Sequence, residues 1–87
     1  MIVIYSKKFR RNYKKLPFKL QEQFKQRRRL FLANPFDLIL NNHALHDPYV
    51  GCRSINITGD YRAIFYQENE SVIHFLIIGT HHELFGT

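Results

Sequence analysis

The last third of the chain constrains the fold most, because three short apolar segments there are separated by two turn signals. The first segment alternates in the manner of a strand, with Arg53, Ile55 and Ile57 on one side. The triplet Thr58-Gly59-Asp60 indicates a tight turn, because glycine adopts a positive φ without a steric penalty. The pattern predicts strands over residues 51–57, 61–67 and 71–78, a second turn over residues 68–70, and a strand end at Gly79, followed by a short terminal turn.

The N-terminal part of the chain predicts one strand followed by two helices. Ile2 to Tyr5 is an apolar run suited to a strand at or next to the edge of a sheet, and Ser6 can cap the helix that follows. We expect the two helices to form a hairpin whose shared apolar stripe faces the sheet and whose exterior is basic. The expected bounds are Lys7 to Leu16, ending at Pro17, and Phe18 to Ala33, ending at Asn34-Pro35.

Residues 36–49, between the helices and the three strands, are the segment that the pattern defines least. The segment is rich in turn-forming residues, so we expect a loop with room for one helical turn near Asp37 to Leu40. Together the elements predict an α+β fold: an N-terminal strand and a two-helix hairpin packed on a twisted, mostly antiparallel four-stranded sheet. The length of 87 residues fits a single domain over residues 1–87.

Basic side chains are concentrated in the first 29 residues. This segment holds 11 Lys or Arg residues and one acidic residue, Glu22, whereas the rest of the chain holds two Arg, Arg53 and Arg62, and six acidic residues. Such an uneven distribution of charge favours a polyanion or an acidic protein as the partner of the helical side. A solvated helix surface explains the same charges equally well.

The cysteine count and the hydropathy limit the cellular compartments in which we expect the protein. A single cysteine, Cys52, excludes an internal disulfide and a Cys-based zinc site. No apolar run is long enough to span a bilayer, and the first residues lack the features of a signal peptide. We therefore expect a cytoplasmic protein that does not associate with a membrane.

Four residues of the C-terminal half are candidates for chemistry: His43, Asp60, Arg62 and His81. A nuclease that works without a metal needs a base, an acid and a cation beside the phosphate. Histidine suits the first two roles because its ordinary pKa lies near neutrality, and the planar fork of arginine matches phosphate. The same residues also have simpler interpretations, such as Asp60 as a turn residue and Arg62 as an exposed strand residue.

Spacing alone does not bring these candidates together. In an antiparallel meander we expect Asp60 and Arg62 to lie at the opposite end of their hairpin from His81, unless twist or the tail brings them back. His43 and His46 have helical i, i+3 spacing, as in half of a metal site, but no acidic or Cys partner stands at a suitable distance. We therefore expect neither a metal nor a cofactor.

The order strand–helix–helix–three strands, with the segments G-C-R-S-I-N-I-T-G-D-Y-R-A-I-F and I-G-T-H-H-E-L-F, resembles the RelE/ParE superfamily of toxin–antitoxin systems, and its YafQ branch of mRNA interferases most. The resemblance covers essentially the full length. It implies metal-independent cleavage of mRNA in the ribosomal A site, by attack of a ribose 2′-OH on its own phosphate. It also implies a cognate antitoxin that blocks the site, and binding of operator DNA only as the toxin–antitoxin complex.

The resemblance also assigns roles to positions of this chain. His81 would be the general acid, His43 or Asp60 the base, and Arg62 or Arg53 the cation that holds the phosphate. The remaining candidates for contact with the substrate are Tyr61, Phe85 and Asn56.

Two positions depart from the YafQ pattern. Asn56 stands where that branch has a second histidine, and Ile77 stands where it has an arginine. Asn56 cannot transfer a proton, and the missing arginine makes Arg62 the expected substitute. These two losses keep open a degenerate toxin that binds only antitoxin and DNA. A further alternative is a ParE-like inhibitor of DNA gyrase, against which the G-T-H-x-x-L-F ending argues, because a gyrase inhibitor has no need for that histidine.

Overall fold

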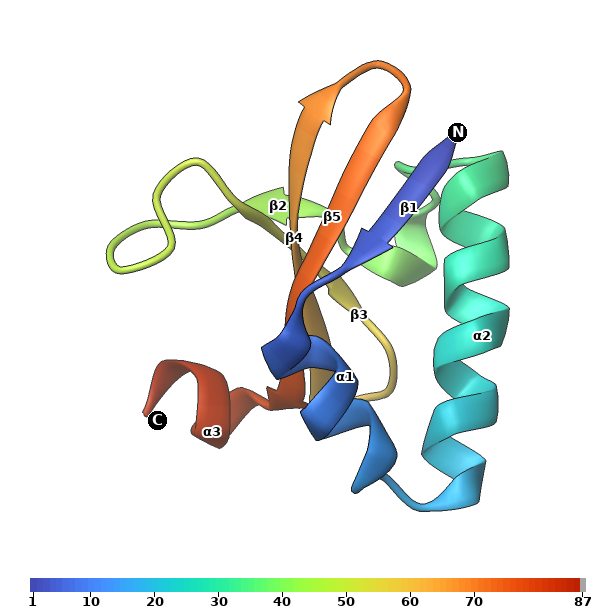
Figure 1. Cartoon of the computed structure of the whole chain (residues 1–87), viewed down its shortest axis with the longest axis vertical. Coiled ribbons are helices and arrows are strands. Elements are labelled where there is room, and N and C mark those ends of the chain that lie inside the picture. Colours follow the sequence, from blue (N-terminus) through green and yellow to red (C-terminus); the bar gives the residue numbers. More distant parts are fainter. Residues whose placement is uncertain (87) are drawn as a thin grey trace.

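A five-stranded sheet forms the centre of the computed structural model, which describes residues 1–86 (Figure 1). The strand order is β1-β5-β4-β3-β2, so the longest two strands lie side by side in the middle. The elements are β1 (Ile2–Tyr5), α1 (Lys7–Lys14), α2 (Phe18–Ala33), the 3₁₀ helix η1 (Leu38–Leu40), β2 (His43–Ala44), β3 (Arg53–Asn56), β4 (Tyr61–Asn69), β5 (Val72–Thr80) and α3 (His81–Phe85).

The sheet is antiparallel except at one edge, where β1 pairs parallel to β5. Ser6 makes the connection from β1 to α1. Its backbone N–H donates to the carbonyl of Phe75 at 3.0 Å, and its hydroxyl donates to the carbonyl of Leu76 at 2.7 Å. The same hydroxyl accepts the N–H of Phe9 at 3.0 Å, so one side chain caps α1 as predicted and holds it against β5.

The two predicted helices are present. The second helix has the expected bounds, whereas α1 ends at Lys14, two residues before Leu16. Pro17 is the N-cap residue of α2, and the helices diverge from this turn (Figure 1). No helix in the described part of the chain has the length and apolar character needed to cross a bilayer.

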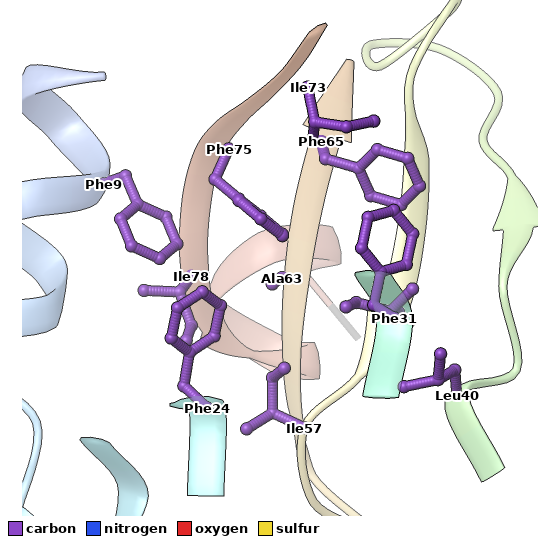
Figure 2. Close-up of a cluster of buried hydrophobic side chains, with 11 residues drawn as sticks. Phe9, Phe24, Phe31, Leu40, Ile57, Ala63, Phe65, Ile73, Phe75 and Ile78 are labelled. Carbon is purple, nitrogen blue, oxygen red and sulfur yellow. The ribbon is translucent and has the colours of Figure 1, made fainter. Parts of the chain in front are cut away.

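Phe75 is the centre of the core between the helices and the sheet (Figure 2). Its side chain is fully buried, and it lies on β5, between β1 and β4 in the sheet. Rings from β1, α1, α2 and β4 all lie within about 6 Å of its ring: Phe24 at 5.3 Å, Phe9 at 5.7 Å, Tyr5 at 5.8 Å, Phe65 at 6.0 Å and Phe31 at 6.1 Å. One side chain therefore contacts four secondary-structure elements.

The opposite face of the sheet is covered in part by α3. Leu84 of this helix is buried, as are Ser54 of β3 and Ile64 of β4, which are register partners. A Cβ built on Gly79 would lie 3.1 Å from the Glu83 carboxylate and 3.4 Å from Leu84, so glycine allows α3 to fold back closely on β5. The expectation that Gly79 ends the last strand is wrong, because β5 continues through it to Thr80.

Two further differences from the predicted elements concern pairing. The segment expected to be a loop contributes a fifth strand, β2, of two residues, where His43 pairs with Ser54 and Ala44 with Arg53. The hairpin between β4 and β5 turns at residues 70–71, later than the predicted residues 68–70, because both strands continue pairing to Asn69 and Val72. The helical turn expected near Asp37 to Leu40 is present as η1. It begins after Asp37, whose side chain caps it.

The position of Phe75 predicts a large effect of a small change. We expect Phe75→Leu to lower the free energy of unfolding by about 1–3 kcal/mol, because it removes several ring contacts and leaves unfilled volume. Urea denaturation measures this difference. Phe18→Leu is the control, because Phe18 is 73% exposed, and its change should stay within about 0.5 kcal/mol. Equal effects of the two substitutions would contradict the central role of Phe75.

The buried hydroxyl of Ser54 predicts a stabilising substitution. Its Oγ is buried and has no hydrogen-bond partner within residues 1–86. We expect Ser54→Ala to leave the free energy of unfolding unchanged or to raise it by up to about 1 kcal/mol, because the desolvation cost of the hydroxyl disappears. Thermal and urea unfolding check this, with Ser71→Ala in the exposed hairpin turn as the control. A loss of more than about 1 kcal/mol would indicate a partner for the hydroxyl.

Candidate functional site

A cavity of about 430 Å³ lies between the segment around β2 and the start of α3. Four of the candidate residues line it: His43, Arg62, His81 and Phe85. The remaining lining residues are Asn41, Ala44, Leu45, His46 and Asp47. Segments that are far apart in the sequence therefore contribute an imidazole, a guanidinium, a second imidazole and an aromatic ring to one hollow.

The register of β4 and β5 brings Arg62 next to the start of α3. Tyr61 pairs with Thr80, the residue just before α3, and Arg62 pairs with Gly79, two residues before α3. The backbone N–H of His81 donates to the carbonyl of Asp60 at 2.9 Å. The expectation that these positions lie at opposite ends of their hairpin is wrong, because the first residues of one antiparallel strand pair with the last residues of the next.

His43 reaches the same cavity from the other side, through β2. Its Nδ1 lies 2.7 Å from the carbonyl oxygen of Asn41. A carbonyl oxygen only accepts hydrogen bonds, so Nδ1 carries the hydrogen and Nε2 has the lone pair in the neutral ring. Asn41 adopts a left-handed conformation with φ of 47°, which asparagine tolerates better than most residues. The local backbone thus fixes which nitrogen of His43 can take a proton.

Arg62 is held by the turn that precedes it. Its Nη1 donates to the carbonyls of Thr58 at 3.0 Å, Gly59 at 3.1 Å and Tyr61 at 3.3 Å. No carboxylate in residues 1–86 forms an ion pair with it, and its Nε and Nη2 make no hydrogen bond there. The guanidinium is therefore anchored through one nitrogen, while its positive charge stays available at the cavity.

His81 and Phe85 belong to the short helix α3, which begins with a capping box. The Thr80 hydroxyl accepts the N–H of Glu83 at 3.1 Å, and the Glu83 carboxylate accepts the N–H of Thr80 at 2.7 Å. The rings of His81 and Phe85, four residues apart, have centroids 4.9 Å apart. The cap thus sets the direction of the turn that carries both rings into the cavity.

Tyr49 links the loop after β2 to α3. Its hydroxyl donates to the carbonyl of Leu84 at 3.0 Å, and the edge of its ring meets Phe85 with centroids 5.9 Å apart. The sequence pattern gave no signal for this contact with α3. The contact holds the two sides of the cavity together.

Arg53 lies away from the cavity. Its Nε donates to the side-chain oxygen of Asn42 at 2.7 Å, and its guanidinium lies over the ring of Phe36 at 5.5 Å. Side chains alternate between the two faces along β3, so Arg53 and its neighbour Ser54 point to opposite faces of the sheet. Of the two arginines considered for binding phosphate, Arg62 is therefore the one that lines the cavity.

Three other candidates also lie outside the lining of the cavity. Asp60 is exposed in the turn, and its carbonyl holds the start of α3. Tyr61 packs against the hydrophobic core on the helical face. Asn56 lines a separate hollow of about 170 Å³ together with Arg27, and its side-chain oxygen is buried without a partner in the described chain.

Asn41, His46 and Asp47 line the cavity but were not among the predicted site residues. The sequence signal for them was weak: a pair of asparagines, a spacing of two histidines and an Asp-Pro turn. Among residues 1–86, no group of three or more His, Cys, Asp and Glu side chains is arranged to hold a metal ion. Burial raises the pKa of the Cys52 thiol, which opposes formation of a reactive thiolate.

Three solved structures resemble the chain along nearly its whole length. YafQ from E. coli has 23% sequence identity and a TM-score of 0.82, and the match covers 97% of each chain. In the DinJ-YafQ toxin-antitoxin complex from E. coli, the match has 23% identity and a TM-score of 0.78 and covers 97% of this chain and 96% of that one. A YoeB/ParE toxin from Agrobacterium tumefaciens has 15% identity and a TM-score of 0.77, with coverage of 93% and 99%. At these identities the likeness shows a shared fold.

The family is shown by the sequence itself. No individual curated protein matches the chain at a significant level. The family described as "Bacterial toxin of type II toxin-antitoxin system, YafQ" matches residues 1–86. Because this match spans all but one residue of the sequence, the chain belongs to the YafQ family of bacterial toxins from type II toxin–antitoxin systems.

Proposed function

We propose that this toxin is an endoribonuclease that cleaves mRNA in the A site of the ribosome, without a metal, and so inhibits translation. The observation that carries the proposal is the cavity lined by His43, Arg62 and His81. These are the residue types that attack by a ribose 2′-OH requires: two groups that transfer protons and one fixed cation. The resemblance to mRNA interferases of the YafQ branch supports the same reaction.

His43 serves as the general base in this proposal. Its Nε2 has the lone pair in the tautomer that Asn41 imposes, so it can take the proton of the 2′-OH. The oxygen then attacks the adjacent phosphorus and forms a 2′,3′-cyclic phosphate. Asp60, the alternative base, is less well supported, because it does not line the cavity.

Arg62 and His81 act on the other side of the phosphorus. The guanidinium of Arg62 stabilises the negative charge that accumulates on the phosphate oxygens in the transition state. As the bond from phosphorus to the 5′-oxygen breaks, His81 in its protonated form donates a proton to that oxygen and yields a free 5′-hydroxyl. Phe85, 4.9 Å from the His81 ring, provides an aromatic surface for a base next to the cleaved bond.

The proposal accounts for the two departures from the YafQ pattern. Ile77 pairs with Ile64 across β4 and β5, and its aliphatic side chain supplies no charge. Arg62 provides the cation from the neighbouring strand instead. Asn56 does not line the cavity, so the proposed proton transfers do not depend on this position.

We propose a cognate antitoxin as the partner of the chain, by analogy with the complex of DinJ and YafQ in E. coli. Binding to operator DNA would occur only through that complex. The exposed basic side chains of α1 and α2 would contribute to binding ribosomal RNA, because Lys and Arg on a surface attract phosphate.

The assigned roles predict a loss of cleavage in two variants. His43→Asn retains a donor for the Asn41 carbonyl but has no atom at Nε2, and His81→Ala removes the acid. We expect each substitution to lower the rate of mRNA cleavage about 10²–10⁴-fold. The measurement is the rate of cleavage on programmed ribosomes, with 5′ ends mapped by primer extension.

His82→Ala is the matched control for these variants. His82 is the exposed neighbour of His81 and does not line the cavity, so its removal should leave the rate unchanged. If expression of wild type and of His81→Ala arrests growth equally while mRNA stays intact, the ribonuclease proposal is lost. DNA breaks that require gyrase would then favour the ParE-like activity.

The hydrogen bond of Tyr49 predicts a fall in kcat that is smaller than the loss of cleavage expected for the two histidine variants. Tyr49→Phe keeps the ring contact with Phe85 but removes the hydrogen bond to the Leu84 carbonyl. We expect kcat to fall at least about threefold with KM little changed, because His81 loses part of its positioning while the substrate surface remains. Single-turnover kinetics test this, with Tyr66→Phe as the control, because Tyr66 is an exposed residue of β4 and does not line the cavity. A change in KM alone would argue for a direct contact with RNA.

A further inference from the structure

A second hollow, of about 340 Å³, lies between α1 and α2 and shares no residue with the cavity of His43 and His81. We call it the interhelix groove. Its floor consists of four aromatic side chains, Tyr5, Phe9, Tyr13 and Phe24. Four basic side chains form its rim: Arg10 and Lys14 from α1, and Lys25 and Arg28 from α2. An apolar hollow is thus enclosed by positive charge.

The floor of the interhelix groove is rigid because its rings pack on one another. Phe24 lies 5.2 Å from Phe9 and 5.7 Å from Tyr13, measured between ring centroids. Gln21 ties the helices together below it, since its side-chain amide donates to the carbonyl of Tyr13 at 2.9 Å. The helices diverge above this tie (Figure 1), and Figure 2 shows Phe9 and Phe24 directed into the core from the two helices. The hollow is therefore already formed in the chain without a partner.

The rim retains most of its positive charge. Arg10 and Lys14 are exposed, lie one helical turn apart, and form no ion pair within residues 1–86. Arg28 donates to the hydroxyl of Tyr5 at 2.7 Å and lies over the Phe24 ring, contacts that fix its position without neutralising it. Lys25 alone is paired, with Glu22 at 3.0 Å. An apolar group that enters the groove with acidic neighbours would meet three unpaired cations.

We propose that the interhelix groove binds an acidic segment of the cognate antitoxin, with an apolar side chain in the hollow and carboxylates on Arg10, Lys14 and Arg28. The inference rests on the proposed partner but not on the proposed reaction. A groove with an aromatic floor suits an apolar anchor, and the surrounding charge selects an acidic segment and accelerates its association. The antitoxin would thereby be anchored on the helical face, apart from the cavity.

RNA fits this groove less well than an acidic peptide does. Bases stack on exposed ring faces, whereas Phe9 and Phe24 are 2% and 1% exposed and present only a recess. An aliphatic or aromatic side chain of a peptide can enter the recess instead.

The test compares two double charge reversals on the same helix. Arg10→Glu/Lys14→Glu changes the rim, and Lys7→Glu/Arg11→Glu makes the same change in charge at exposed positions with the same spacing outside the groove. The probe is the purified product of the reading frame adjoining that of the toxin. Stopped-flow and calorimetric titrations measure its association rate constant and Kd, and circular dichroism confirms that both variants are folded.

We expect the rim variant to lower the association rate constant at least about tenfold and to raise Kd by a similar or larger factor. The control variant should change either quantity less than about threefold. High salt should reduce the difference between the two variants, because it screens the rim charges. This pattern would support the groove as the anchoring site.

Each other outcome overturns the inference in a distinguishable way. If the probe binds wild type and both variants equally, the groove is not its site, and the proposed ribonuclease is unaffected. If the probe does not bind wild type at all, the proposed partner fails and the inference fails with it. If the rim variant weakens binding of an oligouridylate but not of the probe, the groove is an RNA surface. Cleavage assays on wild type decide the reaction independently of all three.

Discussion

The packing of aromatic rings around Phe75 is the interaction on which the other features of the fold depend. A chain of this size buries only about 60–65% of the surface that its unfolded state exposes, so few contacts can be lost without consequence. Phe75 lies on β5 and contacts rings from α1, α2 and the two neighbouring strands, β1 and β4. It therefore fixes the orientation of the helices on one face of the sheet. The same strand ends at the start of α3, so the helical core and the candidate site are positioned by one element.

The candidate site is assembled where three segments end on the less covered face of the sheet. The register of β4 and β5 places Arg62 beside the start of α3, and β2 brings His43 from the other edge. The backbone around each side chain limits its chemistry: Asn41 fixes the tautomer of His43, and the turn carbonyls hold one nitrogen of Arg62. No residue of α1 or α2 lines the cavity, so the proposed proton transfers take place apart from the helical face to which ribosomal RNA or the antitoxin would bind.

Local chemistry explains which elements could be predicted from the sequence. Helix α2 was predicted with its correct bounds, because Pro17 and Asn34-Pro35 mark both ends. Ser6 was predicted as a cap because its hydroxyl can accept a free backbone N–H. The residues that line the cavity were harder to predict. Strand β2 has only two residues, too few for any alternation to be visible, yet it carries His43. Gly79 was interpreted as a break, whereas it provides the close approach of α3, which depends on contacts between distant residues.

The small size of α3 has a consequence for how the toxin behaves over time. A helix of five residues is far too short to be stable alone, so its order depends on its cap, on the burial of Leu84 and on the hydroxyl of Tyr49. Opening this segment costs less free energy than unfolding the sheet, since it exposes one buried side chain and breaks few bonds. Such opening would displace His81 and Phe85 together while the aromatic core stays intact. The fraction of molecules in which the candidate site is intact would therefore follow a local equilibrium of α3, separate from the global stability of the fold.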